Sequence, residues 1–371
     1  MKIEDLVPDN IRSLQPYKAG KTIAEVEKKY QPRQVSKLAS NENRLGCSNK
    51  VARAIQQALS DIQDYPDPLA SNLREKIADL HDVSESEVLL AAGSESIIAL
   101  LCRTFFNDDE HAITASATFV GFFVQSGVRG IKLKKVPLTE DYRFDVDAIL
   151  DAVDDKTKLI YIANPNNPTG TYITKEEYKK LLTGVPDNVL LVMDEAYHEY
   201  ATSVEDYPNY LITRKKNVIT LRTFSKAYGL AGMRVGYAVA REELIEQMIK
   251  TKLTFEPTTP GQAAAFAALD DASFVARSVE MVVNERKRLY DFFDGQNVNY
   301  VRSIANSVMM ILENEDEAKS FTKNMMKQGV ILCRANAFGL PHCIRITIGT
   351  GEEMNHFKES YLNVFDPSES K

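Results

Sequence analysis

The sequence has no tryptophan, and it contains only four cysteines and five histidines in 371 residues. The cysteines, Cys47, Cys102, Cys333 and Cys343, form no CxxC pair. The spacing therefore indicates neither a disulfide framework nor a structural zinc site. The histidines show no HExxH spacing, so we expect no metal site. Free thiols in a reducing compartment are the simplest expectation.

Long apolar segments and blocks of one charge are also missing. AAAFAAL at 263–269, one of the longest apolar runs, is far shorter than the roughly 20 residues of a membrane helix. The 45 basic and 52 acidic side chains are scattered and give a net charge of −7, which argues against nucleic acid or a membrane as the main partner. The stretch MKIEDLVPDN carries acidic residues where a signal peptide needs an apolar segment. We therefore expect a soluble, cytoplasmic protein.

The residues that are present are those of an ordinary globular protein. Hydrophobic residues make up 44% and charged residues 26% of the chain, and this length usually requires more than one core. From about residue 88, short apolar runs alternate with amphipathic helical patterns. The expected strands lie near 88–92, 111–115, 131–136, 159–163, 189–194, 217–221 and 235–240. This order predicts an α/β domain with a mostly parallel sheet covered by helices on both faces.

The pattern changes after residue 255. Long helical stretches are followed by the strand-like runs VMMIL, VILC and CIRITI around a further helix, which predicts a smaller α+β domain. We expect an N-terminal arm at 1–45, a large ligand-binding domain at 46–255 and a small C-terminal domain at 256–371.

Ligands of open parallel sheets bind beyond the carboxyl ends of the strands, so the polar residues that follow strands are the candidates. Gly93, Ser94 and Glu95 follow the first strand and open a helix. A glycine turn at a helix start can bind an anion such as phosphate, although simple N-capping by Ser94 explains the same residues.

Three further strand ends carry polar residues. NPNNPTG (164–170) forms a stiff loop with amide side chains, and Asp194 directly continues an apolar strand. An acid in that position is costly unless it faces a cation, although it could also cap the next turn. The stretch TFSKAYGLAGMRVGY (223–237) brings Lys226 and Arg234, eight residues apart, with no acid beside either.

If these strand ends meet, one ligand satisfies all of them. Pyridoxal 5'-phosphate has a phosphate for Ser94 and Arg234, a ring nitrogen for Asp194, a ring hydroxyl for an amide or phenol, and an aldehyde for Lys226.

These motifs also carry a family resemblance. NPNNPTG, DEAY and SKAYGLAGMRVGY resemble those of the fold-type-I pyridoxal-phosphate aminotransferases of the aspartate aminotransferase superfamily. Within it the chain is most similar to the histidinol-phosphate aminotransferases, through PYKAGK (16–21), KLASNENRLG (37–46), DYPDP (64–68) and RITIGTGEE (345–353).

The resemblance implies a role for each matching residue. Lys226 would bond to the cofactor and move the proton, Asp194 would hold the ring nitrogen, and Asn167 and Tyr197 would bind the ring hydroxyl. The cofactor's phosphate and ring would also contact Ser94, Glu95, Phe119, Thr223, Ser225 and Arg234, together with Tyr65 from a neighbouring subunit. A homodimer with shared active sites follows from that last contact. Tyr65 and Phe119 could instead be ordinary packing aromatics.

The resemblance also assigns a substrate face. Arg345, inside the apolar run CIRITI, would bind the carboxylate or phosphate of a substrate, because its planar fork suits bidentate anions. Arg334 would bind phosphate, and Tyr17 would belong to a closing arm. A structural salt bridge is the alternative for both arginines.

Several positions depart from the usual family pattern: Gln15, Arg44, Cys47 and Phe122. They fall on the arm and the substrate face and leave the amino donor open. The resemblance implies transamination of L-histidinol phosphate with the 2-oxo acid 2-oxoglutarate, giving imidazole-acetol phosphate and L-glutamate in histidine biosynthesis. An aromatic amino-acid aminotransferase or a threonine-phosphate decarboxylase on the same fold are the alternatives.

Overall fold

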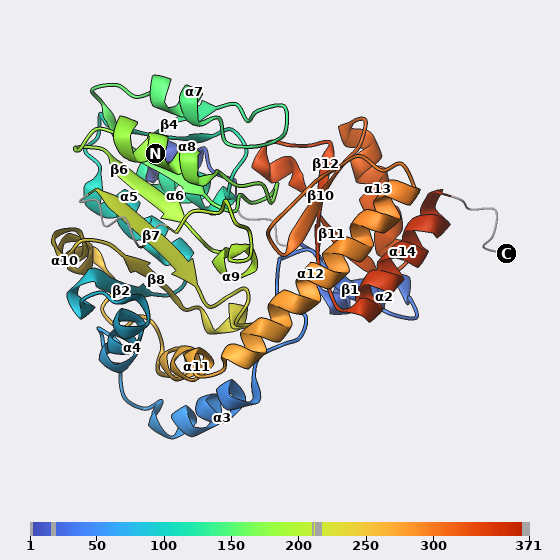
Figure 1. Cartoon of the computed structure of the whole chain (residues 1–371), viewed down its shortest axis with the longest axis horizontal. Coiled ribbons are helices and arrows are strands. Elements are labelled where there is room, and N and C mark those ends of the chain that lie inside the picture. The colour runs from blue at the N-terminus through green and yellow to red at the C-terminus, as the bar shows by residue number, and fades with distance from the viewer. Residues whose placement is uncertain (1–2, 16–19, 210, 212–216, 366–371) are drawn as a thin grey trace.

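The computed structural model describes residues 3–15, 20–209, 211 and 217–365. Figure 1 shows two sheet-containing parts, with the long helix α12 (Ala272–Gly295) running from one to the other. The predicted Tyr17 lies outside the described residues.

The larger part is built on a seven-stranded sheet with the order β2-β8-β7-β6-β5-β3-β4. Its parallel strands are β3 to β7, whereas β8 runs antiparallel to both β7 and β2. The strands are β2 (Val88–Ala91), β3 (His111–Ala115), β4 (Lys132–Val136), β5 (Thr157–Ala163), β6 (Leu190–Asp194), β7 (Val218–Thr223) and β8 (Gly236–Val239). All seven coincide with expected strands, which confirms the α/β prediction.

Helices cover both faces of this sheet. One face packs on α5 (Ser94–Phe105), α6 (Val120–Arg129) and α10 (Glu242–Thr251), and the other on α7 (Val146–Asp151) and α8 (Lys175–Gly184). α8 begins where it does because Thr174 and Glu177 form a capping box that satisfies free N–H groups. The remaining helices of this part are α3 (Asn49–Ala58), α4 (Ser71–His81), α9 (His198–Ala201) and α11 (Thr259–Leu269), with the short 3-10 helices η2 (Leu59–Asp61), η3 (Glu85–Glu87) and η5 (Ala231–Met233).

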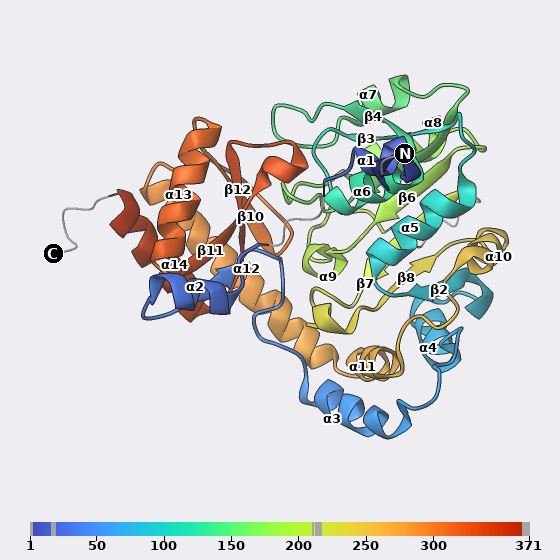
Figure 2. The ribbon, with the colours of Figure 1, turned by 180° about the vertical axis from the view of Figure 1, so that it is seen from behind.

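The smaller part has a five-stranded sheet with the order β1-β11-β12-β10-β9. Its strands are β1 (Ser36–Leu38), β9 (Tyr300–Val301), β10 (Ser307–Ile311), β11 (Val330–Arg334) and β12 (Cys343–Thr347). Its other elements are α2 (Ile23–Tyr30), α13 (Glu315–Lys327), η6 (Ala335–Phe338) and α14 (Gly351–Phe365). The chain begins with η1 (Ile3–Leu6) and α1 (Asp9–Arg12), and α1 packs on α6 of the larger part. In Figure 1, α2 and β1 lie at the smaller part although they come from the start of the chain, as Figure 2 also shows for α2, and β1 forms the edge of its sheet.

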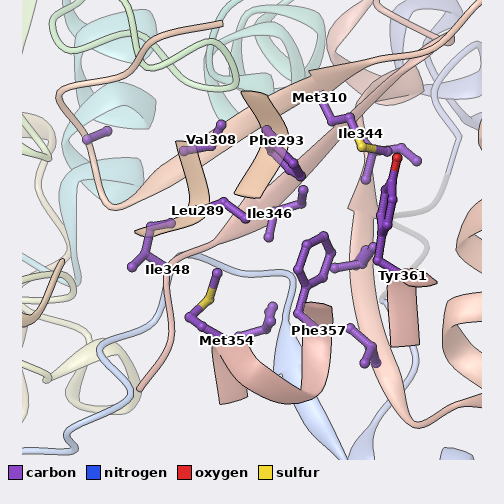
Figure 3. Close-up of a cluster of buried hydrophobic side chains, with 14 of the residues drawn as sticks. Leu289, Phe293, Val308, Met310, Ile344, Ile346, Ile348, Met354, Phe357 and Tyr361 are labelled. Atoms are coloured by element: carbon purple, nitrogen blue, oxygen red, sulfur yellow. The ribbon is translucent and has the colours of Figure 1, made fainter. Parts of the chain in front are cut away.

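The core of the smaller part joins α12, the sheet and α14. In Figure 3, Leu289 and Phe293 of α12 face Ile344 and Ile346 of β12, and Phe357 of α14 lies close by. All five side chains are fully buried. This contact fixes β12, which carries Arg345, against the helix that leads to the larger part.

The packing differs from the expected domain limits in two places. β1 pairs in parallel with β11, so part of the expected arm belongs to the small sheet. α11 packs in the core that contains Val51 of α3 and Leu73 of α4, so the larger part extends beyond residue 255. A three-residue strand such as β1 is too short, and an alanine-rich helix such as α11 too uniform, to show a periodic pattern of apolar residues. The sequence therefore does not indicate to which domain either belongs.

Candidate active site

A cavity of about 350 Å³ lies beyond the carboxyl ends of β5, β6 and β7, where α5 begins. Ten of the predicted cofactor-binding residues line it. They are Ser94, Glu95, Phe119, Asn167, Asp194, Tyr197, Thr223, Ser225, Lys226 and Arg234. A larger cavity between α4, α9 and α12 contains none of the predicted site residues. The smaller cavity is therefore the candidate site.

One end of the cavity is built to accept an anion. α5 starts at Ser94, directly after Gly93, which has a φ of 89°. A Cβ atom at Gly93 would lie 2.8 Å from Nη2 of Arg234, and one at Gly236 would lie 2.6 Å from the backbone nitrogen of Ser94. Both glycines are thus required for the guanidinium and the N–H groups of the helix start to come together.

The cations of this site lack protein anions. Among the described residues, neither Arg234 nor Lys226 forms an ion pair, and Arg234 donates through Nη1 to the carbonyl oxygen of Ala231 at 3.0 Å. Thr223 and Ser225 lie beside them, with their hydroxyl oxygens 2.9 Å apart. A bound phosphate would supply the missing negative charge.

Asp194 ends β6 and is buried. Its Oδ2 accepts a 2.5 Å hydrogen bond from the phenol of Tyr161, and its Oδ1 accepts one from the backbone nitrogen of Ala196 at 3.1 Å. Burial raises the pKa of Asp194 to about 6, although the bonds from Tyr161 and Ala196 act to lower it. A protonated ring nitrogen beside this carboxylate would supply the positive charge that offsets the cost of burying it.

Lys226 follows β7, with its Nζ 5.6 Å from the centre of the Tyr197 ring. Burial first, and then the positive charge of Arg345, lowers the pKa of Lys226 to about 8. Because the shift brings its neutral form closer to physiological pH, this amine is better able to act as a nucleophile and a base.

The residue next to Asp194 has a structural role instead. Glu195 is fully buried and accepts a 2.8 Å bond from Nε of Arg222 on β7. Burial acts to raise the pKa of Glu195, but Arg222 and His198 together lower it below its ordinary value. Glu195 therefore stays charged and does not line the cavity, because neighbouring residues of an extended segment point to opposite sides.

Arg345 lies on β12 and is buried. Its guanidinium donates to Oδ1 of Asn167 and to the carbonyl oxygen of Ala39, and its Nε is buried without a hydrogen-bond partner. No carboxylate is paired with it among the described residues. This arginine thus stands next to a residue of the cavity wall with its charge uncompensated.

Two other predicted residues lie elsewhere. Arg334 forms an ion pair with Glu315 at 2.9 Å and does not line the cavity. Its role as a phosphate ligand therefore stays a prediction. Tyr65 is 80% exposed and stacks on Phe255, with ring centres 4.2 Å apart. Tyr65 does not reach the cavity of its own chain.

Tyr161 and Asn41 bond to residues that line the cavity, and the sequence did not predict them. Tyr161 of β5 binds Asp194 and stacks on Phe122 with ring centres 4.2 Å apart. Asn41 binds the phenol oxygen of Tyr197 at 2.9 Å. Tyr161 could have been suspected, because it lies on the strand two residues before the carboxyl end, whereas nothing local links Asn41 to Tyr197.

Known proteins share both the sequence and the fold. Residues 33–360 match the model of the family "Aminotransferase class I and II". A histidinol-phosphate aminotransferase of Bacillus velezensis is 39% identical over 349 residues, which cover 94% of this chain and 96% of that protein. One from Halalkalibacterium halodurans is 40% identical over 94% of each chain.

Among solved structures, a histidinol-phosphate aminotransferase of Sinorhizobium meliloti in complex with pyridoxal-5'-phosphate superposes with a TM-score of 0.88. It is 27% identical, and the match covers 97% of this chain and 98% of that one. A Thermus thermophilus aspartate aminotransferase, 22% identical with a TM-score of 0.84 over 96% of this chain and 99% of that one, shares the fold. The chain belongs to the class I and II aminotransferases and has the aspartate aminotransferase-like fold.

Proposed function

We propose that the protein is a pyridoxal 5'-phosphate-dependent histidinol-phosphate aminotransferase, which converts L-histidinol phosphate and 2-oxoglutarate into imidazole-acetol phosphate and L-glutamate. The observation that carries the aminotransferase assignment is the convergence of Lys226, Asp194 and the Gly93–Arg234 anion site in one cavity. Relatives of that name, at 39–40% identity over nearly the whole chain, favour the substrate.

The residues of the cavity fit the cofactor. The N–H groups at the start of α5 and Arg234 would hold its phosphate, and Asp194 would hold the proton on its ring nitrogen. Asn167 and Tyr197 are the candidates to bind its ring oxygen. When bound, pyridoxal 5'-phosphate supplies an aldehyde for an amine and a ring that takes up the electron pair left at the α-carbon of the substrate.

Lys226 would move the proton. Its lowered pKa, about 8, means that less free energy is needed for the amine to give up its charge and act as a base at the α-carbon of the donor. Asp194 would hold the ring nitrogen, because its negative charge favours the protonated form of that nitrogen. Asp194 would therefore keep one proton in place on the ring nitrogen, whereas Lys226 would transfer the proton of the α-carbon.

Arg345 would receive the anionic end of both substrates. Its uncompensated charge and its unpaired Nε are satisfied by a carboxylate or a phosphate, either of which accepts two parallel N–H bonds. An amino donor and a 2-oxo acid that bind in turn at the same arginine are consistent with ping-pong kinetics.

The active enzyme is proposed to be a homodimer in which each subunit completes the other's site. Tyr65 is exposed and stacks on Phe255, so the segment after α3 contacts the segment after α10. A bond from Lys252 to the carbonyl oxygen of Pro68 also joins the two segments. Their other exposed apolar side chains are Leu59, Ile62, Leu69 and Leu253. Such a surface is suited to burial against a second copy.

Among the described residues no helix is long and apolar enough to span a membrane.

The substrate assignment is tested by steady-state assays with a panel of amino donors and 2-oxoglutarate. The expected result is a kcat/KM for L-histidinol phosphate well above those for phenylalanine and tyrosine. Better turnover of the aromatic amino acids, or release of carbon dioxide from threonine phosphate, would select one of the alternatives instead.

A further inference from the structure

Asn41 is a heavily hydrogen-bonded polar residue near the site that the proposed chemistry does not use. It lies between β1 and α3, is 1% exposed and has a φ of 53°. A side chain other than glycine is uncommon in that region of backbone space. Glycine and asparagine are the residues that this backbone conformation suits best, and the chain keeps a buried asparagine there.

The hydrogen bonds of Asn41 fix the orientation of its amide. Thr347 on β12 accepts from the backbone nitrogen of Asn41 at 2.9 Å, so the hydroxyl hydrogen of Thr347 is left to donate to Oδ1 at 3.0 Å. Because the oxygen of the amide faces Thr347, its nitrogen faces the other way. Nδ2 donates to the hydroxyl of Ser307 at 3.1 Å and to the phenol oxygen of Tyr197 at 2.9 Å.

The bond to Tyr197 has a directional consequence. Since the phenol oxygen accepts from Asn41, the phenol hydrogen is left to donate elsewhere, and Tyr197 lines the cavity. Tyr197 is 3% exposed, so little water competes for that donor. Burial raises the pKa of the Tyr197 phenol, and the hydrogen bond from Asn41 acts to lower it.

Two partners of Asn41, Ser307 and Thr347, belong to the sheet that carries Arg345. Ser307 and Thr347 face each other across β10 and β12, and Thr347 lies two residues from Arg345 on the same side of β12. Arg345 in turn donates to the carbonyl oxygen of Ala39. The short segment 39–41 is thus held by β12 at both ends and connects the small sheet to Tyr197.

We propose that Asn41 is a positioning residue for Tyr197, which holds the phenol oxygen in place from the small sheet so that the phenol hydrogen is donated into the cavity. The inference rests on the proposed function, because it assigns that donation to the ring oxygen of the bound cofactor. Asn41 itself touches neither cofactor nor substrate in this role.

Two variants separate positioning from folding. Asn41→Gly removes the side chain and suits the positive φ, whereas Asn41→Asp keeps an acceptor for Thr347 but loses the donor to Tyr197. Asn297→Gly is the matched control, since Asn297 also has a positive φ, of 55°, and is exposed at the end of α12.

Both readouts are spectroscopic and use no substrate. The first is the ¹³Cζ resonance of Tyr197 in the cofactor-free protein, assigned with Tyr197→Phe. The second is the pH midpoint of the visible absorbance of the bound cofactor. A donor to the ring oxygen lowers that midpoint by stabilising negative charge there, so its loss raises the midpoint, by roughly 0.5–1 pH unit for one hydrogen bond.

The expected result is that both Asn41 variants move the resonance and raise the midpoint, that Asn297→Gly does neither, and that Asn41→Gly adds no shift in a Tyr197→Phe background. Unchanged resonance and midpoint in both variants, with only a loss of thermal stability, would overturn the proposal. Failure of L-histidinol phosphate to react would overturn the proposed substrate and leave these readouts intact.

Discussion

The backbone of Gly93 lies so close to the guanidinium of Arg234 that a Cβ atom at residue 93 would stand 2.8 Å from Nη2 of the arginine. The glycine also has a φ of 89°. These two facts make Gly93 the residue that lets a helix start and an arginine share one anion.

Replacing Gly93 with alanine should weaken cofactor binding, because the new methyl group displaces Arg234 and strains the turn. We expect the Kd for pyridoxal 5'-phosphate to rise at least roughly tenfold, as titration of the cofactor-free protein would measure. Gly295→Ala is the control, since a Cβ atom there meets nothing within 4 Å. Equal Kd values for the two variants would contradict the anion site.

The lowered pKa of Lys226 predicts a pH-dependent stability. The amine has a folded pKa of about 8 against an ordinary value of 10.5. At a pH below about 8 its positive charge therefore destabilises the folded, cofactor-free protein. In that protein Lys226→Met should raise the free energy of unfolding at pH 7 by about 1 kcal/mol, a value reduced for partial exposure to solvent.

The sign of this effect can be checked by urea unfolding at several pH values. The cost of the charge disappears as pH rises from about 8 toward 10.5, so the two proteins should converge over that range. A methionine variant that is less stable at pH 7, or a gain that grows with pH, would contradict the assignment of Lys226 as a desolvated amine.

Arg345 should control substrate binding more than stability. Arg345→Lys keeps the charge but loses the planar fork, so we expect the KM of both the donor and 2-oxoglutarate to rise by roughly 10- to 100-fold. Steady-state kinetics measure this. An effect on only one substrate would contradict a shared anion site.

Arg334→Lys is the comparison for Arg345. If the ion pair with Glu315 is the whole role of Arg334, neither KM changes. If Arg334 also binds the phosphate of the donor, the KM of L-histidinol phosphate rises while that of 2-oxoglutarate does not.

The shared site predicts complementation between subunits. Tyr65→Ala and Lys226→Ala should each lose most activity, but mixing the unfolded proteins and refolding them together should restore roughly a quarter of the parent activity, because half the dimers then hold one intact site. Size-exclusion chromatography verifies the dimer. No recovery in a verified hybrid dimer would show that Tyr65 does not act across the interface.

The sequence predicts this site well where a residue follows a strand. Asp194, Lys226 and Ser94 could be found because apolar runs end directly at them or just before them, and parallel strands end on the same edge. Asn41 could not be placed in this way. Asn41 meets Tyr197 across 156 residues, and such a contact depends on how two sheets pack and not on any local pattern.

The limits of the fold prediction have a similar cause. β1 has only three residues and forms because β11 offers a parallel edge. The alanine-rich α11 has no strong polar face, so the sequence does not show which side of it is buried. Its position depends on how its small side chains pack against α3 and α4. The substrate face around Arg345 was expected from the family resemblance, because the periodicity of the sequence does not indicate it, and it stays a prediction.

The central claim is most directly tested by a single half-reaction. The cofactor-loaded enzyme is mixed with L-histidinol phosphate in the absence of any 2-oxo acid, and the visible absorbance of the cofactor and the released imidazole-acetol phosphate are both followed. The account predicts loss of the absorbance and one equivalent of product per subunit, with the absorbance restored by 2-oxoglutarate. An unchanged spectrum with L-histidinol phosphate, beside a full response to tyrosine or phenylalanine, would contradict it.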